Sequence, residues 1–534
     1  MLHFKKETRG YPHVLHNIAI HADRVIKRIG FAALGHCVGQ PRAAQHAEST
    51  MVDSYSPLQS LSCHSPVPIP DCAQGVELMA DPIHGYVPFT VPFERTGRPE
   101  EVTEKDLIDT PWMQRLRAIT QLQSARWVFP AAEHSRFQHS LGTMHVAGRF
   151  AQQLYPSLRQ VEPGCPSLPL VEALLRVSGL LHDVGHGPFC HFFDENHLAQ
   201  YGIGHEVLGH RIITQELGDM IRHVRRSPSG DFADDEVLEP EFIAFLMQKK
   251  AAVADHMPVW LQLLKPVLSG MYTADNLDYV LRDAYMCGVA VGPVDLGRLL
   301  HYSFLTAQGL TLHTAGIGAL TMFLTARLYL YTHLYFHRTT RAIDLHLREI
   351  FQETMHYLFP GNPLEHLDRY VGLTDWSLLE AVRHWESDAH PGKQALGREW
   401  TAILQRRVKW KMAYDATLSV REWERRTGER CDPHQLITGM RKVLPPSLRD
   451  LECQIDVATQ DPRNINPLMM GEWPIALYDP STGKVRAELL ETMLEFIPAE
   501  MTQYRLYTTD EACKPVVARA CEAALFDTNK GRNG

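Results

Sequence analysis

Hydrophobic residues recur at helical spacing through most of residues 76–350. The clearest segments are 171–183, 276–288 and 318–351, in which apolar side chains return every three or four positions. Strand and helix patterns do not alternate regularly, which argues against a parallel sheet. The pattern therefore predicts a mainly helical core over residues 76–350.

The pattern changes toward the C-terminus. Residues 351–420 remain helical and rich in tryptophan, and a helix at 510–526 closes the chain. Between them lie three short β-like runs, with the turn sequence DPSTGK beside the second: 453–459, 474–479 and 503–509. We therefore expect a mainly α fold, in which residues 351–534 form a smaller α+β lobe.

The first 75 residues differ from the rest in composition. Residues 1–50 hold seven Lys and Arg against three Asp and Glu, and residues 51–75 are rich in Ser and Pro, which is typical of a linker. A basic, acid-poor leader is also the composition of a transit peptide. We favour a poorly ordered extension, or a start codon placed upstream of Met51.

Composition narrows the class of protein. The chain has 534 residues, of which 45% are hydrophobic and 22% charged, as in a globular protein with a sizeable core. The formal net charge of −9 argues against a general polyanion-binding surface. Ten cysteines without a C-x-x-C pair indicate reduced thiols and a cytoplasmic protein. No apolar run reaches the roughly 18 residues of a membrane span.

Residues 176–191, RVSGLLHDVGHGPFCH, carry the strongest chemical signal. An apolar helical run ends in His182 and Asp183, and two more histidines follow within nine residues. Burying titratable groups without partners is costly, so this pattern indicates a bound charge. Histidine and carboxylate together suit Zn, Fe, Mn or Co. His139 and Asp275, each beside an apolar helical segment, are further candidate ligands.

Each of these residue types also has an ordinary structural role. A histidine on an apolar helix is usually a core residue, and an isolated His-Asp pair occurs by chance in many chains. Asp275, Asp278 and Asp283 could be solvated helix charges, with Arg282 paired to Asp278 four residues earlier.

Several blocks together resemble the HD-domain metal phosphohydrolases, and more closely their dNTP triphosphohydrolase branch of the SAM-and-HD-domain type. The resemblance covers roughly residues 80–345, and no SAM domain is visible. The blocks occur in the order of the family: DPIHGYV (81–87), TPWMQRLRAITQL (110–122), VFPAAEHSRFQHSLG (128–142), LLHDVGHGPFCHFFD (180–194), HE (205–206), DNLDYVLRDAYMCGV (275–289) and YFHRTTRAID (335–344).

The resemblance implies a metal site and a neighbouring catalytic set. The implied ligands of a divalent transition ion are His139, His182, Asp183 and Asp275. The catalytic positions are His186, His191, Asp194 and His205. In the implied mechanism His191 is the general acid at the leaving oxygen, and His205 with Asp194 orients the attacking water. The alternative is that some members of this second set only support the metal ligands.

The resemblance also implies contacts to a nucleotide. Arg136 corresponds to a phosphate-binding arginine, and Arg338 with His337 to basic positions of the substrate cleft, with Arg341 a weaker match. Gln121 and Leu122 correspond to the pair that contacts the sugar and excludes a ribose hydroxyl. Tyr279 would back the sugar and Asp283 would accept from its 3′-hydroxyl. Mg²⁺ would accompany the substrate phosphates. Without the resemblance, Arg338 and Arg341 are ordinary surface charges.

The chain departs from the family pattern at two positions. Asn276 replaces the usual basic residue after the last metal aspartate, and Gln123 stands where a glycine often follows the Gln-Leu pair. Asp81 and Arg117 match positions that bind an activating guanine nucleotide in oligomeric members. Both also suit a structural role, as a turn residue and a helix charge.

The function predicted from the sequence is metal-dependent hydrolysis of a dNTP to a deoxynucleoside and inorganic triphosphate, by a homo-oligomer. One alternative is an HD phosphohydrolase that acts on another nucleotide or phosphate ester, which Asn276 supports. The alternative of another class is a nucleotide sensor or nucleic-acid-binding module with a silent HD site. The complete ligand set and the negative charge do not favour that class.

Overall fold

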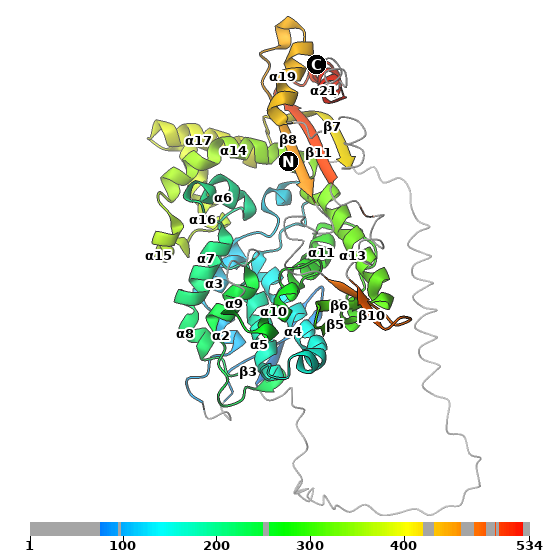
Figure 1. Cartoon of the computed structure of the whole chain (residues 1–534). Helices are drawn as coiled ribbons and strands as arrows, with labels where there is room; N and C mark the ends of the chain where they lie inside the picture. Colours follow the sequence, from blue (N-terminus) through cyan, green and yellow to red (C-terminus); the bar gives the residue numbers. More distant parts are fainter. Residues whose placement is uncertain are drawn as a thin grey trace, which may run out of the picture. The chain divides into compact units, whose positions relative to one another are not determined.

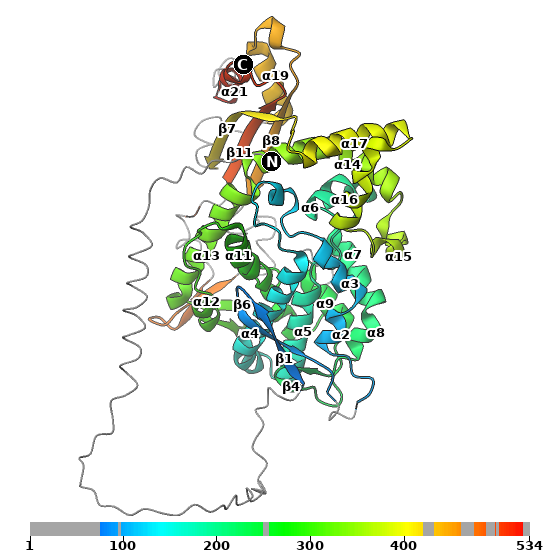
Figure 2. The same ribbon diagram turned by 180° about the vertical axis from the view of Figure 1, so that it is seen from behind.

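The computed structural model describes residues 75–93, 98–248, 256–419, 432–460, 475–486, 497 and 501–526. The predicted N-terminal extension, residues 1–75, lies outside these ranges except for Gly75. The described residues confirm a mainly α fold with small sheets (Figures 1 and 2). All six described cysteines are free thiols.

Most of the described chain is helical. The helices are α2 (Glu104–Ile108), α3 (Pro111–Gln114), α4 (Arg136–Val161), α5 (Leu168–Leu181), α6 (His191–Asn196), α7 (His205–Arg211), α8 (Gly218–Arg222), α9 (Pro240–Met247), α10 (Val259–Leu264), α11 (Ala274–Cys287), α12 (Leu296–His301), α13 (Ile317–Leu330), α14 (Arg338–Leu358), α15 (Leu367–Tyr370), α16 (Asp375–Arg383), α17 (Pro391–Leu404), α19 (Pro433–Val443) and α21 (Lys514–Phe526). A π-helical turn at Tyr331–Tyr335 joins α13 to the segment before α14.

The strands form small, mostly antiparallel sheets. Their bounds are β1 (Val76–Asp81), β2 (Gly85–Thr90), β3 (Arg226–Ser227), β4 (Gly230–Asp231), β5 (Ser303–Thr306), β6 (Gly309–His313), β7 (Lys411–Ser419), β8 (Cys453–Gln460), β9 (Ala476–Asp479), β10 (Lys484–Arg486) and β11 (Met501–Thr508). The sheet orders are β1-β2, β3-β4, β10-β9-β6-β5 and β7-β11-β8. β6 and β9 run parallel, and every other pair of these described strands runs antiparallel.

Three helices at the centre of the core position the site, because α4 packs on both α5 and α11. Helices α5 and α11 each begin at a capping side chain: the Ser167 hydroxyl accepts from Leu170 N, and Thr273 and Asn276 cap one another at the start of α11. Gly142 on α4 permits the close approach of α11. A Cβ atom there would lie 1.9 Å from Oδ1 of Asp278.

The C-terminal α+β lobe is built from the β7-β11-β8 sheet, with α19 and α21 packed on it around a second hydrophobic cluster. The predicted boundary at residue 351 falls inside α14, and the main core continues through Trp400 and Trp410. The predicted strand near 474–479 does form, as β9, but it pairs with β6 of the core rather than with the lobe.

Candidate functional site

Three side chains from three helices meet at the candidate metal cluster. His139 lies in the first turn of α4, His182 follows the last residue of α5, and Asp275 lies in the first turn of α11. The Nε2 atoms of His139 and His182 are 3.2 Å apart, and Asp275 Oδ1 is 3.0 Å and 3.7 Å from them. Donors at ~2.1 Å from one ion are ~3.0–3.4 Å apart. The three residues therefore fit one divalent cation.

Both histidines present the same nitrogen to this point. His182 Nδ1 lies 2.8 Å from the carbonyl oxygen of Gly179, and His139 Nδ1 lies 2.7 Å from Oδ2 of Asp278. Nδ1 of each ring faces an acceptor, so displacement of the Nε2 proton by a metal would leave the Nε2 lone pair directed at the point where the two rings meet. Burial lowers the pKa of His139, but the neighbouring carboxylates of Asp275 and Asp278 raise it to about 10. The carboxylate charge at this site thus favours a bound cation.

Asp183, the fourth predicted ligand, lies at the edge of the cluster. Its Oδ1 is 3.4 Å from His182 Nε2, and its Oδ2 is 3.9 Å from His139 Nε2. The Arg136 guanidinium forms an ion pair with the same carboxylate. Burial would raise the pKa of Asp183, but Arg136 holds it well below its usual value. Asp183 is therefore an ionised donor beside the other three.

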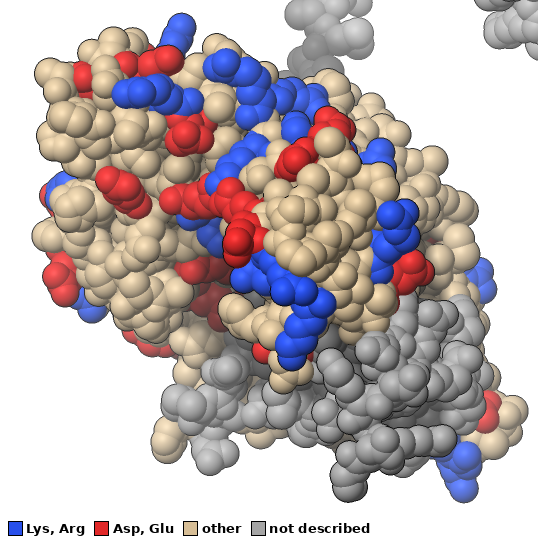
Figure 3. All heavy atoms as spheres, turned by 90° about the horizontal axis from the view of Figure 1, so that it is seen from above, with Lys and Arg blue, Asp and Glu red and all other residues tan. Residues whose placement is uncertain are grey.

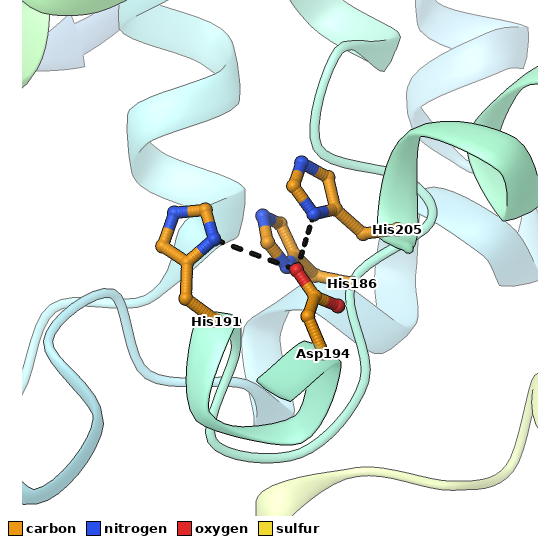
Figure 4. Close-up of side chains that lie close together, drawn as sticks. All are labelled: His186, His191, Asp194 and His205. Carbon is orange, nitrogen blue, oxygen red and sulfur yellow. Dashed lines mark hydrogen bonds and ion pairs between the residues drawn. The ribbon is translucent and has the colours of Figure 1, made fainter. Parts of the chain in front are cut away.

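The four predicted catalytic residues form a second cluster next to the first, and Figure 4 shows their side chains facing one another. His205 Nδ1 lies 2.5 Å and His191 Nδ1 3.5 Å from Asp194 Oδ2. Burial would raise the pKa of Asp194, but these two contacts hold it well below its usual value. An imidazole held by an ionised carboxylate has a fixed tautomer, which suits proton transfer.

His186 connects the two clusters. Its ring stacks on His205 at 3.7 Å, and its Nε2 is 3.4 Å from Asp183 Oδ1. Burial and the Arg136 guanidinium hold the pKa of His186 well below its usual value. Neither of its ring nitrogens has a hydrogen bond within the described part of the chain. A buried neutral imidazole with unused nitrogens indicates a place for a ligand or water.

The loop that carries His191 is held in a strained conformation. Phe189 and Cys190 have φ values of 60° and 55°, in the left-handed region that non-glycine residues rarely adopt. Asp375 on α16 accepts from Phe189 N at 2.8 Å, and Cys190 Sγ donates to Thr120 O at 3.1 Å. Strain of this kind costs about 1–3 kcal/mol per residue and is common at functional sites.

Both clusters open into one cavity of about 340 Å³. Five of the seven predicted substrate-binding residues line it: Gln121, Leu122, Arg136, Tyr279 and Asp283. The π-helical turn adds Tyr331 and Tyr335 to the wall. Tyr335 donates to Asp283 Oδ2 at 2.6 Å, and His134 Nε2 lies 2.8 Å from Asp283 Oδ1. Asp283 is therefore a fixed acceptor within the cavity.

Two of the predicted substrate contacts, His337 and Arg338, do not line this cavity, and their contact with a substrate stays a prediction. Helix α14 begins at this point. His337 accepts from Thr339 N as a helix cap, and the exposed Arg338 receives a hydrogen bond at its carbonyl from Tyr507. Arg341, the weaker match, does line the cavity.

The residues of the predicted effector site are not in contact with each other. Asp81 accepts from the backbone of Ile83 and His84 and forms an ion pair with Arg282 at 3.0 Å. Arg117 is exposed and lies over the ring of Phe137. Asp81 thus has the contacts of a turn residue, and nucleotide binding at Asp81 and Arg117 stays a prediction.

The sequence did not predict a role for Arg327, a basic residue near the cavity wall. Arg327 on α13 is buried beside Tyr331, and its Nε and NH1 atoms have no partner among the described residues. Its place in an apolar helix gave no signal in the sequence.

Asn276, where the sequence departs from the family pattern, has a structural role. It is buried and caps α11 through Thr273, so it belongs to the start of the helix rather than to the cavity wall.

Comparison with known proteins agrees with this geometry. The HD domain family model matches residues 136–252. YwfO, an uncharacterized protein of Bacillus subtilis, is 30% identical over 330 residues, or 58% of this chain and 67% of that protein. The deoxynucleoside triphosphate triphosphohydrolase SAMHD1 homolog of Dictyostelium discoideum is 28% identical over 280 residues, which span 52% of this chain and 51% of its own length.

A solved phosphohydrolase structure from Bacteroides thetaiotaomicron has the same fold, with a TM-score of 0.58 at 19% identity over 81% of this chain and 99% of that one. The chain belongs to the HD-domain family, within the phosphohydrolase superfamily. An HD domain implies a bound divalent metal, and the described His and Asp clusters are able to hold one.

Proposed function

We propose that the protein hydrolyses deoxynucleoside triphosphates to deoxynucleosides and inorganic triphosphate. The observation that carries the proposal is the meeting of the two clusters in one cavity that also holds Gln121, Leu122 and Tyr279. A metal cluster alone would serve any phosphate ester, whereas these added residues suit a deoxyribose next to the reacting phosphate. The related Dictyostelium protein named for this activity supports the same substrate class.

The residues of the two clusters have different roles in the proposed hydrolysis. His139, His182, Asp183 and Asp275 would hold a divalent transition ion (Fe, Mn, Zn or Co), which supplies Lewis-acid polarisation of the α-phosphoryl group and activation of water. Mg²⁺ would accompany the phosphates. His205, fixed by Asp194, orients the attacking water, and His186 completes the polar wall behind it. His191, whose side chain is 57% exposed, protonates the leaving 5′ oxygen.

The same region accounts for substrate binding. Arg136 in the wall, and Arg327 behind the wall residue Tyr331, supply positive charge for the phosphates, which an acidic protein must concentrate locally. Leu122 presses on C2′ and disfavours a ribose hydroxyl, Asp283 accepts from the 3′-hydroxyl, and Gln121 contacts the sugar. Tyr279, whose ring lies 6.5 Å from the His139 ring, backs the sugar.

Regulation and assembly belong to the same proposal. We expect a homo-oligomer in the cytoplasm that a guanine nucleotide activates, with Arg117 as its exposed contact. No helix among the described residues is long and apolar enough to cross a membrane.

Product analysis tests the proposed function. The protein would be incubated with each dNTP and NTP in Mg²⁺, Mn²⁺ or Co²⁺, with and without GTP, and nucleoside and triphosphate would be separated by chromatography. We expect deoxynucleoside and intact triphosphate, and their loss in the His182→Ala/Asp183→Ala variant. Monophosphate with pyrophosphate would instead place the cleavage at another bond.

The second enzymatic candidate is hydrolysis of another nucleotide or phosphate ester, and Asn276 favours it, because this residue caps α11 instead of contacting phosphate. The nucleic-acid-binding class receives less support. On the face seen in Figure 3, Lys and Arg side chains lie among Asp and Glu side chains, whereas a polynucleotide needs a continuous basic surface.

A further inference from the structure

The cavity wall carries a second set of polar side chains, here called the polar end, that none of the roles above uses. It is formed by Thr340, Asp344 and Arg348 of α14 and Glu195 of α6, with Leu122, Ala125, Phe192 and Phe336 as apolar walls. Ser124, two residues after Leu122, donates a hydrogen bond to Asp344 Oδ1. This end is therefore joined directly to the segment that we assign to the sugar.

The hydrogen-bonding capacity of this end is incompletely used. Thr340 is 4% exposed, and its hydroxyl has no partner among the described residues. Asp344 is 6% exposed, and the nearest cation to its Oδ2 is Arg341 NH1 at 3.8 Å. Buried polar groups are normally paired, so a hydroxyl and a carboxylate oxygen left over on a cavity wall indicate a ligand.

The charges nearby leave the Asp344 carboxylate available. Arg341 is committed to Asp456 of β8 through Nε–Oδ2 and NH2–Oδ1 contacts of 2.9 Å and 2.5 Å. Arg348 lines the cavity and has no hydrogen bond or ion pair to a described residue. The end thus offers one acceptor group, Asp344, and one free donor group, Arg348.

From this arrangement we infer that the polar end binds the base of the nucleotide and selects guanine. A carboxylate binds two adjacent N–H donors, and among the DNA bases only guanine has them, at N1 and N2, next to the O6 acceptor that a guanidinium prefers. Enzymes that bind a single base contact this edge and enclose its faces with apolar side chains. The inference deepens the proposed function and rests on it for the position of the sugar.

The test is competition among the four dNTPs in one reaction, with wild-type protein and Asp344→Asn. A bidentate base contact is worth roughly tenfold in discrimination. We expect wild type to prefer dGTP by about that factor, and Asp344→Asn to reduce kcat/KM for dGTP alone. Thr340→Val, which removes only an unpartnered hydroxyl, should weaken dGTP selectively as well. Glu353→Gln, an exposed change on the same helix, is the matched control and should match wild type.

Equal kcat/KM for all four dNTPs in the wild type would overturn the inference while leaving the proposed function intact. An equal loss for all four in Asp344→Asn would also overturn it, since that is the result of a structural role. If the wild type hydrolyses no dNTP, the proposed function fails. Calorimetry with deoxyguanosine and deoxyadenosine then decides the base inference: a deoxyguanosine preference that Asp344→Asn abolishes supports it, and equal binding overturns it.

Discussion

His139 Nδ1 lies 2.7 Å from Oδ2 of Asp278, a contact that joins the metal cluster to a buried network of charges. Asp278 is fully buried and also contacts His84 Nε2 at 2.7 Å and Arg282 at 2.9 Å. Arg282 in turn reaches Asp81 on the β1-β2 hairpin. The orientation of His139, a proposed metal ligand, is therefore set by residues outside the candidate metal cluster.

Replacing Asp278 should weaken metal binding. Asp278→Asn keeps the shape of the side chain but removes the charge that fixes the His139 tautomer, and such partners contribute about 10- to 100-fold in affinity. The measurement is metal content by mass spectrometry after dialysis against graded chelator. Asp219→Asn, a change of a fully exposed aspartate, is the control. Retention of metal equal to that of wild type would contradict this role for Asp278.

Two helical glycines should respond oppositely to alanine. In Gly142→Ala the new Cβ would meet the Asp278 carboxylate at 1.9 Å, so we expect a loss of several kcal/mol of stability, on the order of other overpacked buried sites. In Gly318→Ala the Cβ meets nothing within 4 Å, and helix propensity should add about 0.5–1 kcal/mol. Thermal unfolding of both variants checks the pair, and equal midpoints would refute the packing argument.

We expect Arg327 to lower the stability of the free protein and to favour dNTP binding. Its guanidinium is buried, its Nε and NH1 atoms have no partner and no carboxylate lies beside it among the described residues, and a buried charge without a counter-ion is costly. Arg327→Met should therefore raise the unfolding midpoint of the free protein. It should also raise KM for a dNTP by roughly two- to fivefold, since a charge that acts on the phosphates without touching them contributes about 1 kcal/mol or less. The exposed substitution Arg383→Met serves as control, and an unchanged KM would remove Arg327 from the phosphate site.

The stability of the protein should depend on pH through Asp344. Burial raises the pKa of this carboxyl to about 6, despite the opposing effect of Arg341. Because the folded-state pKa lies above the unfolded value, the stabilising contribution is present below about pH 4 and is lost as the pH rises through about 6. Relative to Asp344→Asn, wild type should lose about 3 kcal/mol of unfolding free energy over that range. A difference that stays constant with pH would show an ordinary pKa.

That several candidate site residues would lie close together could be anticipated, because they occur in short, specific blocks of the sequence. His182, Asp183, His186 and His191 lie within ten positions, and the chain geometry of one helix end and one loop brings them together. The separate ligands His139 and Asp275 followed from the blocks around them. Their convergence needs the packing of α4 on α5 and α11, which no local pattern contains.

Other features of the structure could not be predicted from local sequence patterns. The β5-β6 hairpin receives its third strand, β9, from more than 160 residues later, so its pairing could not be inferred from the hairpin itself. Arg327 and Asp344 sit in segments with ordinary helical periodicity, and only burial distinguishes them from surface charges. Gln123 stands where a glycine is common, and its φ of 49° gives the backbone reason for that preference.

The strained loop before His191 bears on how the molecule can be divided. Phe189 is anchored by Asp375 on α16, and the carbonyl of His186 by Arg115, so the turn is supported from both sides of the chain. Neither anchor, nor the ligand Asp275, falls within the matched HD segment of residues 136–252. Excised alone, that segment would lack one ligand and the groups that hold the others in place. The proposed site therefore depends on the whole core, and we do not expect residues 136–252 alone to reproduce it.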